Sequence, residues 1–292
     1  MTPRSLRLAL STGLNYHALE WDGPGETTFV LVHGFSDLGW AWAPVASRLA
    51  AHAHVVAPDL RGHGDSDWIG AGGYYHFLDY IADLDDVIAQ TARRHVVLVG
   101  HSMGGMICGY YAGTRPERLA ALCVIEGLGP PDLEGVEGPA RTSLWLDAWK
   151  TAMPRRGHTK PLASYAEAAA RLRKNDPRLD EETALFLAEA GTRAHPDGLR
   201  WKHDPLHYTS GPYPFRVAVA AKYWARVSSP VLVVDGEAST LNLPIAERAA
   251  RRAHFPQHTH VIVPDAGHAV PRHQPAAVAD LLLGLARTAG AA

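Results

Sequence analysis

The segment His95–Gly104 reads HVVLVGHSMG, an apolar run followed directly by a G-x-S-x-G pattern centred on Ser102. A short β-branched run bounded by glycine predicts a buried strand, and the proline-free stretch that begins at Met103 predicts a helix. A serine at so sharp a strand-to-helix turn exposes its hydroxyl at the carboxyl edge of a sheet. The pattern therefore predicts a nucleophilic Ser102; the alternative is a glycine-rich turn in which Ser102 only caps the helix.

Around this segment, apolar runs alternate with amphipathic stretches, which predicts an α/β fold with a mostly parallel sheet flanked by helices. The segment Arg4–Trp21 is expected to form a leading hairpin. Further strands are expected over Thr28–Val32, His54–Ala57, His95–Val99, Leu119–Ile125, Pro230–Val234 and His258–Val263, and helices over Trp42–Ala51, Phe77–Ala92, Met103–Gly113, Ile245–Ala253 and Pro275–Arg287.

The regular alternation stops after the sixth expected strand. Residues 128–223 contain no strand-like run, and so long a structureless loop would be unusual in a compact domain. We expect a helical cap there, inserted into a core formed by residues 1–127 and 224–292, and covering Ser102. Trp145 and Trp149 are candidate substrate-binding residues of the cap; alternatively, they pack only the cap's own core.

Composition excludes several classes of partner. The formal net charge of the 292 residues is −2 and the basic residues are scattered, which argues against binding to nucleic acid or to a membrane surface. No apolar stretch is long enough to cross a bilayer, and Met1–Leu10 lacks the apolar run of a signal peptide. Cys108 and Cys123 are expected to be buried thiols without metal-ligand spacing, which favours a cytoplasmic location. The oligomeric state is left open.

Two further motifs follow the first strong strands: His33-Gly34-Phe35 and the segment Asp59–Ser66, which reads DLRGHGDS. With the G-x-S-x-G turn and the insertion, they make the chain resemble the α/β-hydrolase fold family from about Arg4 to Ala289. The resemblance implies that the backbone N–H groups of Phe35 and Met103 hold an oxyanion. It also implies that His33 and the Asp59–Ser66 segment brace the neighbouring loops.

The resemblance also selects a base from the 17 histidines of the chain. His268 lies in the segment Asp265–Ala269, between the last expected strand and the last expected helix, and matches the family's catalytic base. His101, next to the serine, is expected to pack within the turn.

The catalytic acid departs from the family's commonest pattern, because no Asp follows Gly236 in the segment Gly236–Asn242. Glu126, which ends the sixth expected strand, is the first candidate, since some members of the family carry their acid there. A carboxylate that closes a buried strand needs a partner, which His268 would supply. Asp235 and Glu237 are the runners-up, and Glu126 could also bond only backbone N–H groups of the cap.

These residues together predict a serine hydrolase that cleaves a carboxylic ester of a small, apolar substrate through an acyl-enzyme, without metal or organic cofactor. Lactone, thioester or carbon–carbon bond hydrolysis and acyl transfer remain open on the same triad. The alternative from another class is a non-catalytic small-molecule binding protein, for which the absence of an Asp after Gly236 is the only support.

Overall fold

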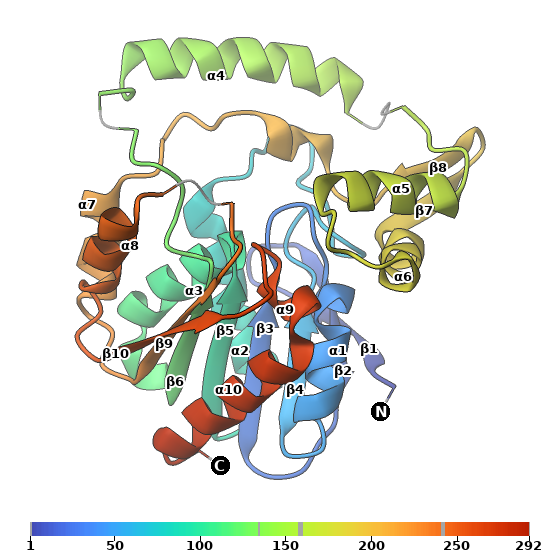
Figure 1. Cartoon of the computed structure of the whole chain (residues 1–292). Helices are drawn as coiled ribbons and strands as arrows, with labels where there is room; N and C mark the ends of the chain where they lie inside the picture. The colour runs from blue at the N-terminus through green and yellow to red at the C-terminus, as the bar shows by residue number, and fades with distance from the viewer. Residues whose placement is uncertain (1, 134, 157–159, 241–242, 292) are drawn as a thin grey trace.

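A single sheet organises the computed structural model, which describes residues 2–133, 135–156, 160–240 and 243–291 (Figure 1). Its strand order is β1-β2-β4-β3-β5-β6-β9-β10; β1 and β2 are antiparallel to their neighbours, and the other strands pair in parallel. The strands are β1 (Arg4–Ala9), β2 (Asn15–Trp21), β3 (Thr27–Val32), β4 (His54–Pro58), β5 (His95–His101), β6 (Ala121–Ile125), β9 (Val231–Gly236) and β10 (His258–Val263).

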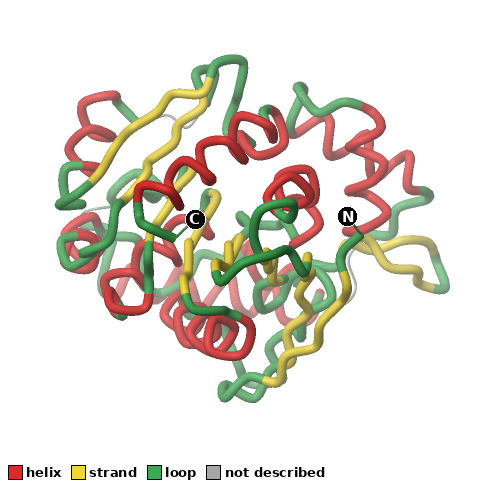
Figure 2. Tube along the Cα trace, turned by 90° about the horizontal axis from the view of Figure 1, so that it is seen from below, coloured by secondary structure: helices red, strands yellow, loops and turns green. Residues whose placement is uncertain are grey.

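Helices cover both faces of this sheet, as the end-on view shows (Figure 2). The flanking helices are α1 (Ala43–Leu49), α2 (Phe77–Thr91), α3 (Met103–Thr114), α7 (Val217–Trp224), α8 (Ile245–Arg252), α9 (Val270–His273) and α10 (Pro275–Thr288), with 3₁₀ turns η1 (Gly39–Trp42) and η2 (Pro116–Arg118).

Helices cover both faces of the strand β5, which explains why its sequence is apolar without alternation. Val96 and Leu98 pack into the core beneath α2, α3 and α7, whereas Val97 and Val99 pack into the opposite core beneath α1 and α10. Both faces of the strand are therefore removed from water, which is usual for parallel sheets. The expected strands and helices of the core, including the leading hairpin, are all present close to their expected bounds, so the predicted fold class is confirmed.

The insertion after β6 lies above the carboxyl ends of the parallel strands (Figure 1). It contains α4 (Pro139–Ala152), η3 (Met153–Arg155), α5 (Tyr165–Asn175), α6 (Glu181–Gly191) and η4 (Pro205–Tyr208). It also contains an antiparallel hairpin that we did not expect, formed by β7 (Thr192–His195) and β8 (Gly198–Trp201). These strands are short and largely polar, so only the Pro-Asp-Gly turn at 196–198 could have indicated them.

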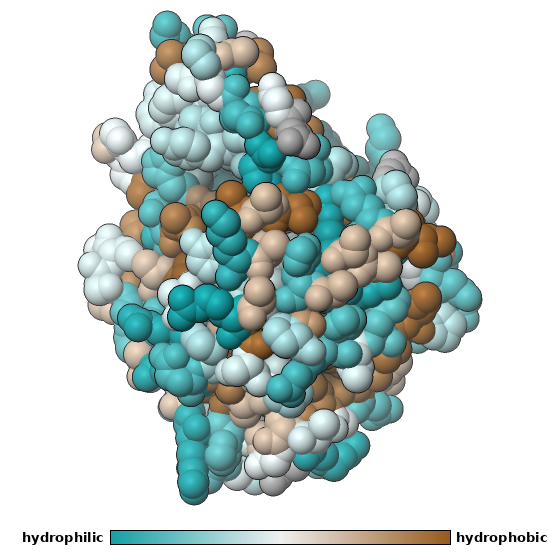
Figure 3. Space-filling view, turned by 90° about the vertical axis from the view of Figure 1, so that its left-hand side faces the viewer, coloured by the Kyte–Doolittle hydropathy of each residue, from teal (hydrophilic) through white to brown (hydrophobic). Residues whose placement is uncertain are grey.

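The helix α7 differs from the rest of residues 128–223, because it packs against α3 instead of the cap. Its last residue, Trp224, is fully buried and stacks on Phe255 at a centroid distance of 5.4 Å. The layers of the core thus resume at α7, slightly before the expected boundary at residue 224. On the side of the molecule that carries α7 and α8, hydrophobic residues occur in small groups among hydrophilic ones (Figure 3).

Candidate active site

Ser102 occupies a strained turn between β5 and α3. Its backbone dihedrals are φ 54° and ψ −120°, a combination that L-residues rarely adopt. Its N–H donates a hydrogen bond to the carbonyl of Ile125 at the end of β6, at 2.9 Å. The turn also needs a glycine at 104, because a Cβ there would lie 2.3 Å from the carbonyl oxygen of Val32.

The other strained residues lie in loops beside Ser102. In the described parts of the chain, the non-glycine residues with positive φ are Ser36, Ser102, Glu126 and Asp265. They belong to the loops that follow β3, β5, β6 and β10, all at the carboxyl edge of the sheet. Backbone strain of this kind costs of order 1–3 kcal/mol per residue and concentrates at functional sites.

His268 reaches Ser102 from the loop between β10 and α9. Its Nε2 lies 3.0 Å from Ser102 Oγ. The loop is held by His101, whose Nε2 lies 2.8 Å from the carbonyl oxygen of His268. Burial lowers the pKa of His101 to about 4, so this ring is neutral near pH 7 and donates its Nε2–H to that carbonyl. His101 therefore has a hydrogen-bonding role beyond the packing that we expected.

Glu126 lies on the other side of the His268 ring, with its Oε2 3.3 Å from Nδ1. The Gly236 N–H donates to Glu126 Oε1 and the Ser239 hydroxyl donates to Oε2, each at 2.7 Å. The carboxylate side chain is only 1% exposed. Burial raises the pKa of the Glu126 carboxyl, but the hydrogen bonds from His268, Ser239 and Gly236 outweigh it and hold the pKa below the usual value.

The runner-up acids lie elsewhere. Asp235 Oδ2 is 2.9 Å from His260 Nε2, and it also faces the guanidinium groups of Arg252 and Arg248 at 3.5 and 3.7 Å. Glu237 accepts a hydrogen bond from the Asp265 N–H at 3.4 Å. The structure therefore brings Glu126, and neither of these two carboxylates, to His268. Sequence reasoning missed Ser239, because nothing in the sequence relates it to Glu126.

The loop after β3 lies directly against the serine. A Cβ placed on Gly34 would be 3.1 Å from Ser102 Cβ. His33 braces this loop, since its Nδ1 donates to the Gly34 carbonyl at 2.7 Å and its Nε2 accepts from the Leu60 N–H at 2.9 Å. Within the described chain, no protein acceptor is recorded for the N–H groups of Phe35 or Met103. Both donors remain available to a bound group.

A cavity of about 710 Å³ opens onto Ser102 and His268. It is lined by the loop after β3, the end of α5, the loop from α5 to α6, and α9. Trp145 and Trp149 do not line it; both pack against Tyr74, with ring centroids 5.6 and 5.1 Å away. Trp201 is the tryptophan of the cap that lines the cavity.

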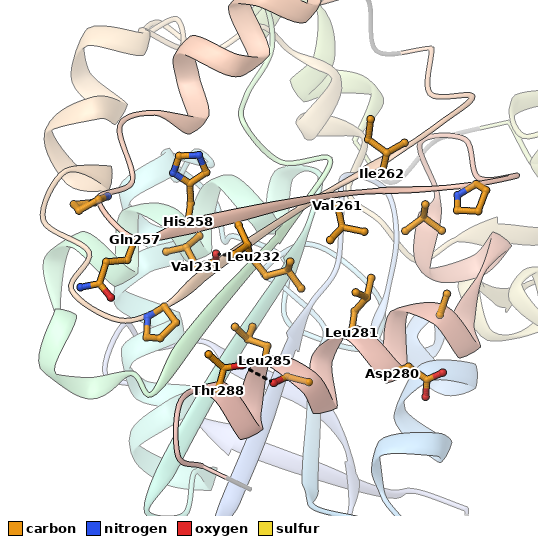
Figure 4. Close-up of a pocket in the computed structure, with 17 residues that line it drawn as sticks. Val231, Leu232, Gln257, His258, Val261, Ile262, Asp280, Leu281, Leu285 and Thr288 are labelled. Carbon is orange, nitrogen blue, oxygen red and sulfur yellow. Dashed lines mark hydrogen bonds between the residues drawn. The ribbon is translucent and has the colours of Figure 1, made fainter.

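A larger groove, of about 1,070 Å³, lies away from this site, between β10 and α10 (Figure 4). Its lining is mostly aliphatic, and Val261, Leu281 and Leu285 point into it. It contains no pair of side chains suited to nucleophilic catalysis. The smaller cavity, which holds Ser102 and His268, is therefore the candidate active site.

One group of described residues has the composition of a metal site: His17, Asp59 and Asp65, whose ligand atoms lie within 4.8 Å of one another. These side chains already have partners, since His17 Nδ1 bonds Asp59 at 2.8 Å and Lys202 Nζ bonds Asp65 at 2.7 Å. The bond between Lys202 and Asp65 connects the cap to the core. Cys108 and Cys123 are free and buried, as expected. Across the described residues, no helix has the length and apolar character that a membrane span requires.

Comparisons with known proteins agree with this fold. The family model described as alpha/beta hydrolase fold matches residues 27–271. A relative from Cupriavidus necator, a 3-hydroxybutyrate-oligomer hydrolase, is 31% identical over 90% of this chain and 89% of its own length. Epoxide hydrolase 4 of Mus musculus is 33% identical, but over only 39% of this chain and 32% of that protein.

The thioesterase domain from the curacin biosynthetic pathway is a similar solved structure, with a TM-score of 0.86 and 28% identity over 97% of this chain and all of that domain. The family model covers most of this chain, the relative is similar over nearly its full length, and the solved structure is similar over almost the whole chain. The chain therefore belongs to the alpha/beta hydrolase fold family.

Proposed function

We propose that this protein is a serine hydrolase that cleaves carboxylic esters through an acyl-enzyme. The observation that carries the proposal is the chain of contacts from Ser102 Oγ to His268 Nε2, at 3.0 Å, and from His268 Nδ1 to Glu126, at 3.3 Å. A serine hydroxyl is a poor nucleophile until a base removes its proton. His268 lies within hydrogen-bond distance of that proton, and Glu126 is held ionised by its other hydrogen bonds.

In the proposed mechanism, Ser102 Oγ attacks the ester carbonyl carbon while His268 Nε2 takes the hydroxyl proton. Glu126 orients the ring and stabilises the imidazolium that forms. The N–H groups of Phe35 and Met103 donate to the tetrahedral oxyanion, a contribution typically of ~3 kcal/mol per donor. His268 then gives its proton to the leaving alkoxide, and the acyl group stays on Ser102.

Water completes the cycle. His268 removes a proton from a water molecule, whose oxygen attacks the acyl carbonyl, and collapse of the second tetrahedral intermediate returns the proton to Ser102 Oγ. The products are a carboxylic acid and an alcohol.

The relatives support an ester substrate over the other chemistries of this triad. The Cupriavidus necator relative is named for an oligomer of a hydroxy acid, whose units are joined by ester bonds. Thioester hydrolysis, named in the curacin domain, follows the same steps with a thiol as leaving group. The resemblance implies that family members with an Asp at the nucleophile position open epoxides, whereas this chain has Ser102 there. The contact between Glu126 and His268, at 3.3 Å, favours a catalytic protein over a non-catalytic binding protein, whose only support was the absence of an Asp after Gly236.

The test compares wild type, Ser102→Ala and Ser143→Ala on p-nitrophenyl butyrate. Ser102→Ala should lower kcat by ~10⁴-fold or more, because the nucleophile is removed. Ser143 is exposed on α4, so its replacement should leave kcat unchanged. A fluorophosphonate should label Ser102, as mapped by mass spectrometry. Full activity of Ser102→Ala, or labelling at a different residue, would rule the proposal out.

A further inference from the structure

Two of the three arginines that line the cavity are paired with acidic side chains. Arg272 pairs with Asp37 at 2.5 Å, and Arg171 pairs with Glu167 at 2.7 Å. The third arginine in the lining, Arg178, is exposed and has no acidic partner among the described residues.

Arg178 is placed close to the catalytic histidine. Its Cδ lies 3.5 Å from the position that a Cβ on Gly267 would occupy. The aliphatic part of the side chain therefore packs over Gly267, the residue directly before His268. Arg178 is among the residues that line the same cavity as Ser102 and His268.

The loop that carries Arg178 is fixed to the core. Asp176 accepts a hydrogen bond from the Arg178 N–H at 3.3 Å and pairs with His273 Nε2 at 2.9 Å. His273 Nδ1 in turn accepts from the Gly267 N–H at 3.0 Å. In Figure 1 this loop, between α5 and α6, lies beside α9. The backbone of Arg178 is thus tied to the loop of His268 through one carboxylate and one ring.

We propose that Arg178 binds a carboxylate of the substrate, so that the natural ester carries a second, negatively charged group. A guanidinium presents a planar pair of donors that matches a carboxylate and binds it by two charge-assisted hydrogen bonds. A positive charge in a cleft also raises the local concentration of anions. Asn175, which lines the same part of the cavity, adds an amide donor.

This inference rests on the proposed ester hydrolysis and changes its substrate class. The expectation of an apolar substrate came from cap aromatics, and Trp145 and Trp149 lie outside the lining of the cavity. Polar side chains at the end of α5 and in the α5–α6 loop, Asn175 and Arg178, line the cavity instead of these two tryptophans.

The experiment uses two ester pairs, each with a charged and a neutral member. Mono-p-nitrophenyl adipate and its methyl ester differ by a carboxylate in the acyl part. The second pair, 4-acetoxybenzoate and its methyl ester, differs by a carboxylate in the leaving group. The measured quantity is the ratio of kcat/KM for the charged member to that for the neutral member. Arg178→Gln should lower this ratio ~10- to 100-fold in at least one pair, mainly through KM.

Two further variants separate charge recognition from structural damage. Arg178→Lys should keep part of the ratio, because it retains the charge without the paired donors. Arg173→Gln is the matched control: Arg173 is exposed on α5, the helix before the loop of Arg178, and lies outside the cavity lining, so the ratio should equal that of wild type. Equal ratios in wild type and Arg178→Gln for both pairs, or an equal fall in Arg173→Gln, would overturn the inference.

The neutral esters report on the proposed function independently. If they are cleaved by wild type and not by Ser102→Ala, ester hydrolysis stands whatever the ratios show. If no ester is cleaved, ester hydrolysis fails, and Arg178 is judged by calorimetric titration with monomethyl adipate and 4-hydroxybenzoate. A Kd at least ~10-fold weaker in Arg178→Gln for one ligand supports carboxylate binding, and equal Kd values refute it.

Discussion

Glu126 reaches the site because β6 lies between β5, which leads to Ser102, and β9, which ends at Gly236. The Ser102 N–H bonds the Ile125 carbonyl, and the Glu126 N–H bonds the Val234 carbonyl, both at 2.9 Å. The end of β6 is therefore fixed on both sides, next to the serine and next to Gly236. Asp235 is on β9, but its side chain meets His260 and the arginines of α8.

This difference predicts unequal effects of two conservative substitutions. Glu126→Gln should lower kcat by up to ~10⁴-fold, because a neutral amide cannot stabilise the imidazolium of His268. Asp235→Asn should lower kcat less than ~10-fold, because it disturbs only the contacts with His260, Arg248 and Arg252. Steady-state kinetics on a p-nitrophenyl ester checks both, with urea unfolding as the control for folding. If Asp235→Asn lost most of its kcat while Glu126→Gln kept it, the catalytic acid would lie on β9.

At the scale of the element, α3 approaches the sheet more closely than side chains permit. A Cβ on Gly104 would meet the carbonyl oxygens of Val32 and His33 at 2.3 and 2.5 Å. A Cβ on Gly284 in α10, by contrast, would have no heavy atom nearer than 3.9 Å. Packing therefore requires a glycine at position 104 but not at position 284.

Gly104→Ala and Gly284→Ala should therefore change stability in opposite directions. Gly104→Ala should destabilise the protein by ~1–3 kcal/mol or more, because backbone oxygens cannot move aside easily. Gly284→Ala should stabilise it by ~0.5–1 kcal/mol, because alanine loses less conformational entropy in a helix. The free energies of unfolding in urea measure both. Stabilisation by Gly104→Ala would mean that α3 is not packed this tightly.

At the scale of the whole molecule, the buried His63 and the partly buried His207 join the cap to the loop after β3. His63 Nε2 accepts a hydrogen bond from the Ser36 N–H at 3.1 Å, and its ring lies 4.4 Å from that of His207 in η4. His207 stacks on Tyr75 at 3.8 Å. Burial lowers the pKa of His63 well below its usual value, and it lowers the pKa of His207 and His203 to about 4.

These shifts predict a loss of stability in mild acid. In the unfolded chain these histidines take up protons near the ordinary pKa of ~6.5. In the folded protein His207 and His203 stay neutral down to about pH 4, and the pKa of His63 is also lowered. Their contribution is therefore complete above about pH 6.5 and falls as the pH drops toward 4. His207→Phe, which keeps the stacking on Tyr75, should reduce the loss between about pH 7 and pH 5 by up to ~2 kcal/mol.

The control for this prediction is His52→Gln, since His52 is exposed. Free energies of unfolding in urea at both pH values give the loss for each variant. Only the difference in free energy of unfolding between the two pH values is compared, so a general destabilisation of His207→Phe does not affect the result. If the loss is the same in wild type and His207→Phe, His207 does not act in this way.

Local patterns were sufficient for the core of the fold. The apolar run before Ser102 and the runs that match β3 and β9 predict strands, because two covered faces demand continuous apolar residues. The hairpin β7–β8 was missed because its four-residue strands carry no such run. The substrate contacts proposed for Trp145 and Trp149 came from residue type alone, and residue type does not tell which side of a cap faces the cavity.

The sequence by itself determined the sheet and the turn at Ser102, because each depends on residues close together in the chain. The resemblance to the α/β-hydrolase family supplied the candidates for base and acid. Only the tertiary structure decided which carboxylate meets His268. Glu126 and Ser239 are 113 positions apart, and they meet because the ends of β6 and β9 are neighbours. The same holds for Arg178, whose lack of an acidic partner depends on how the α5–α6 loop folds back onto Gly267. Such contacts follow from packing between distant elements, which no local pattern specifies.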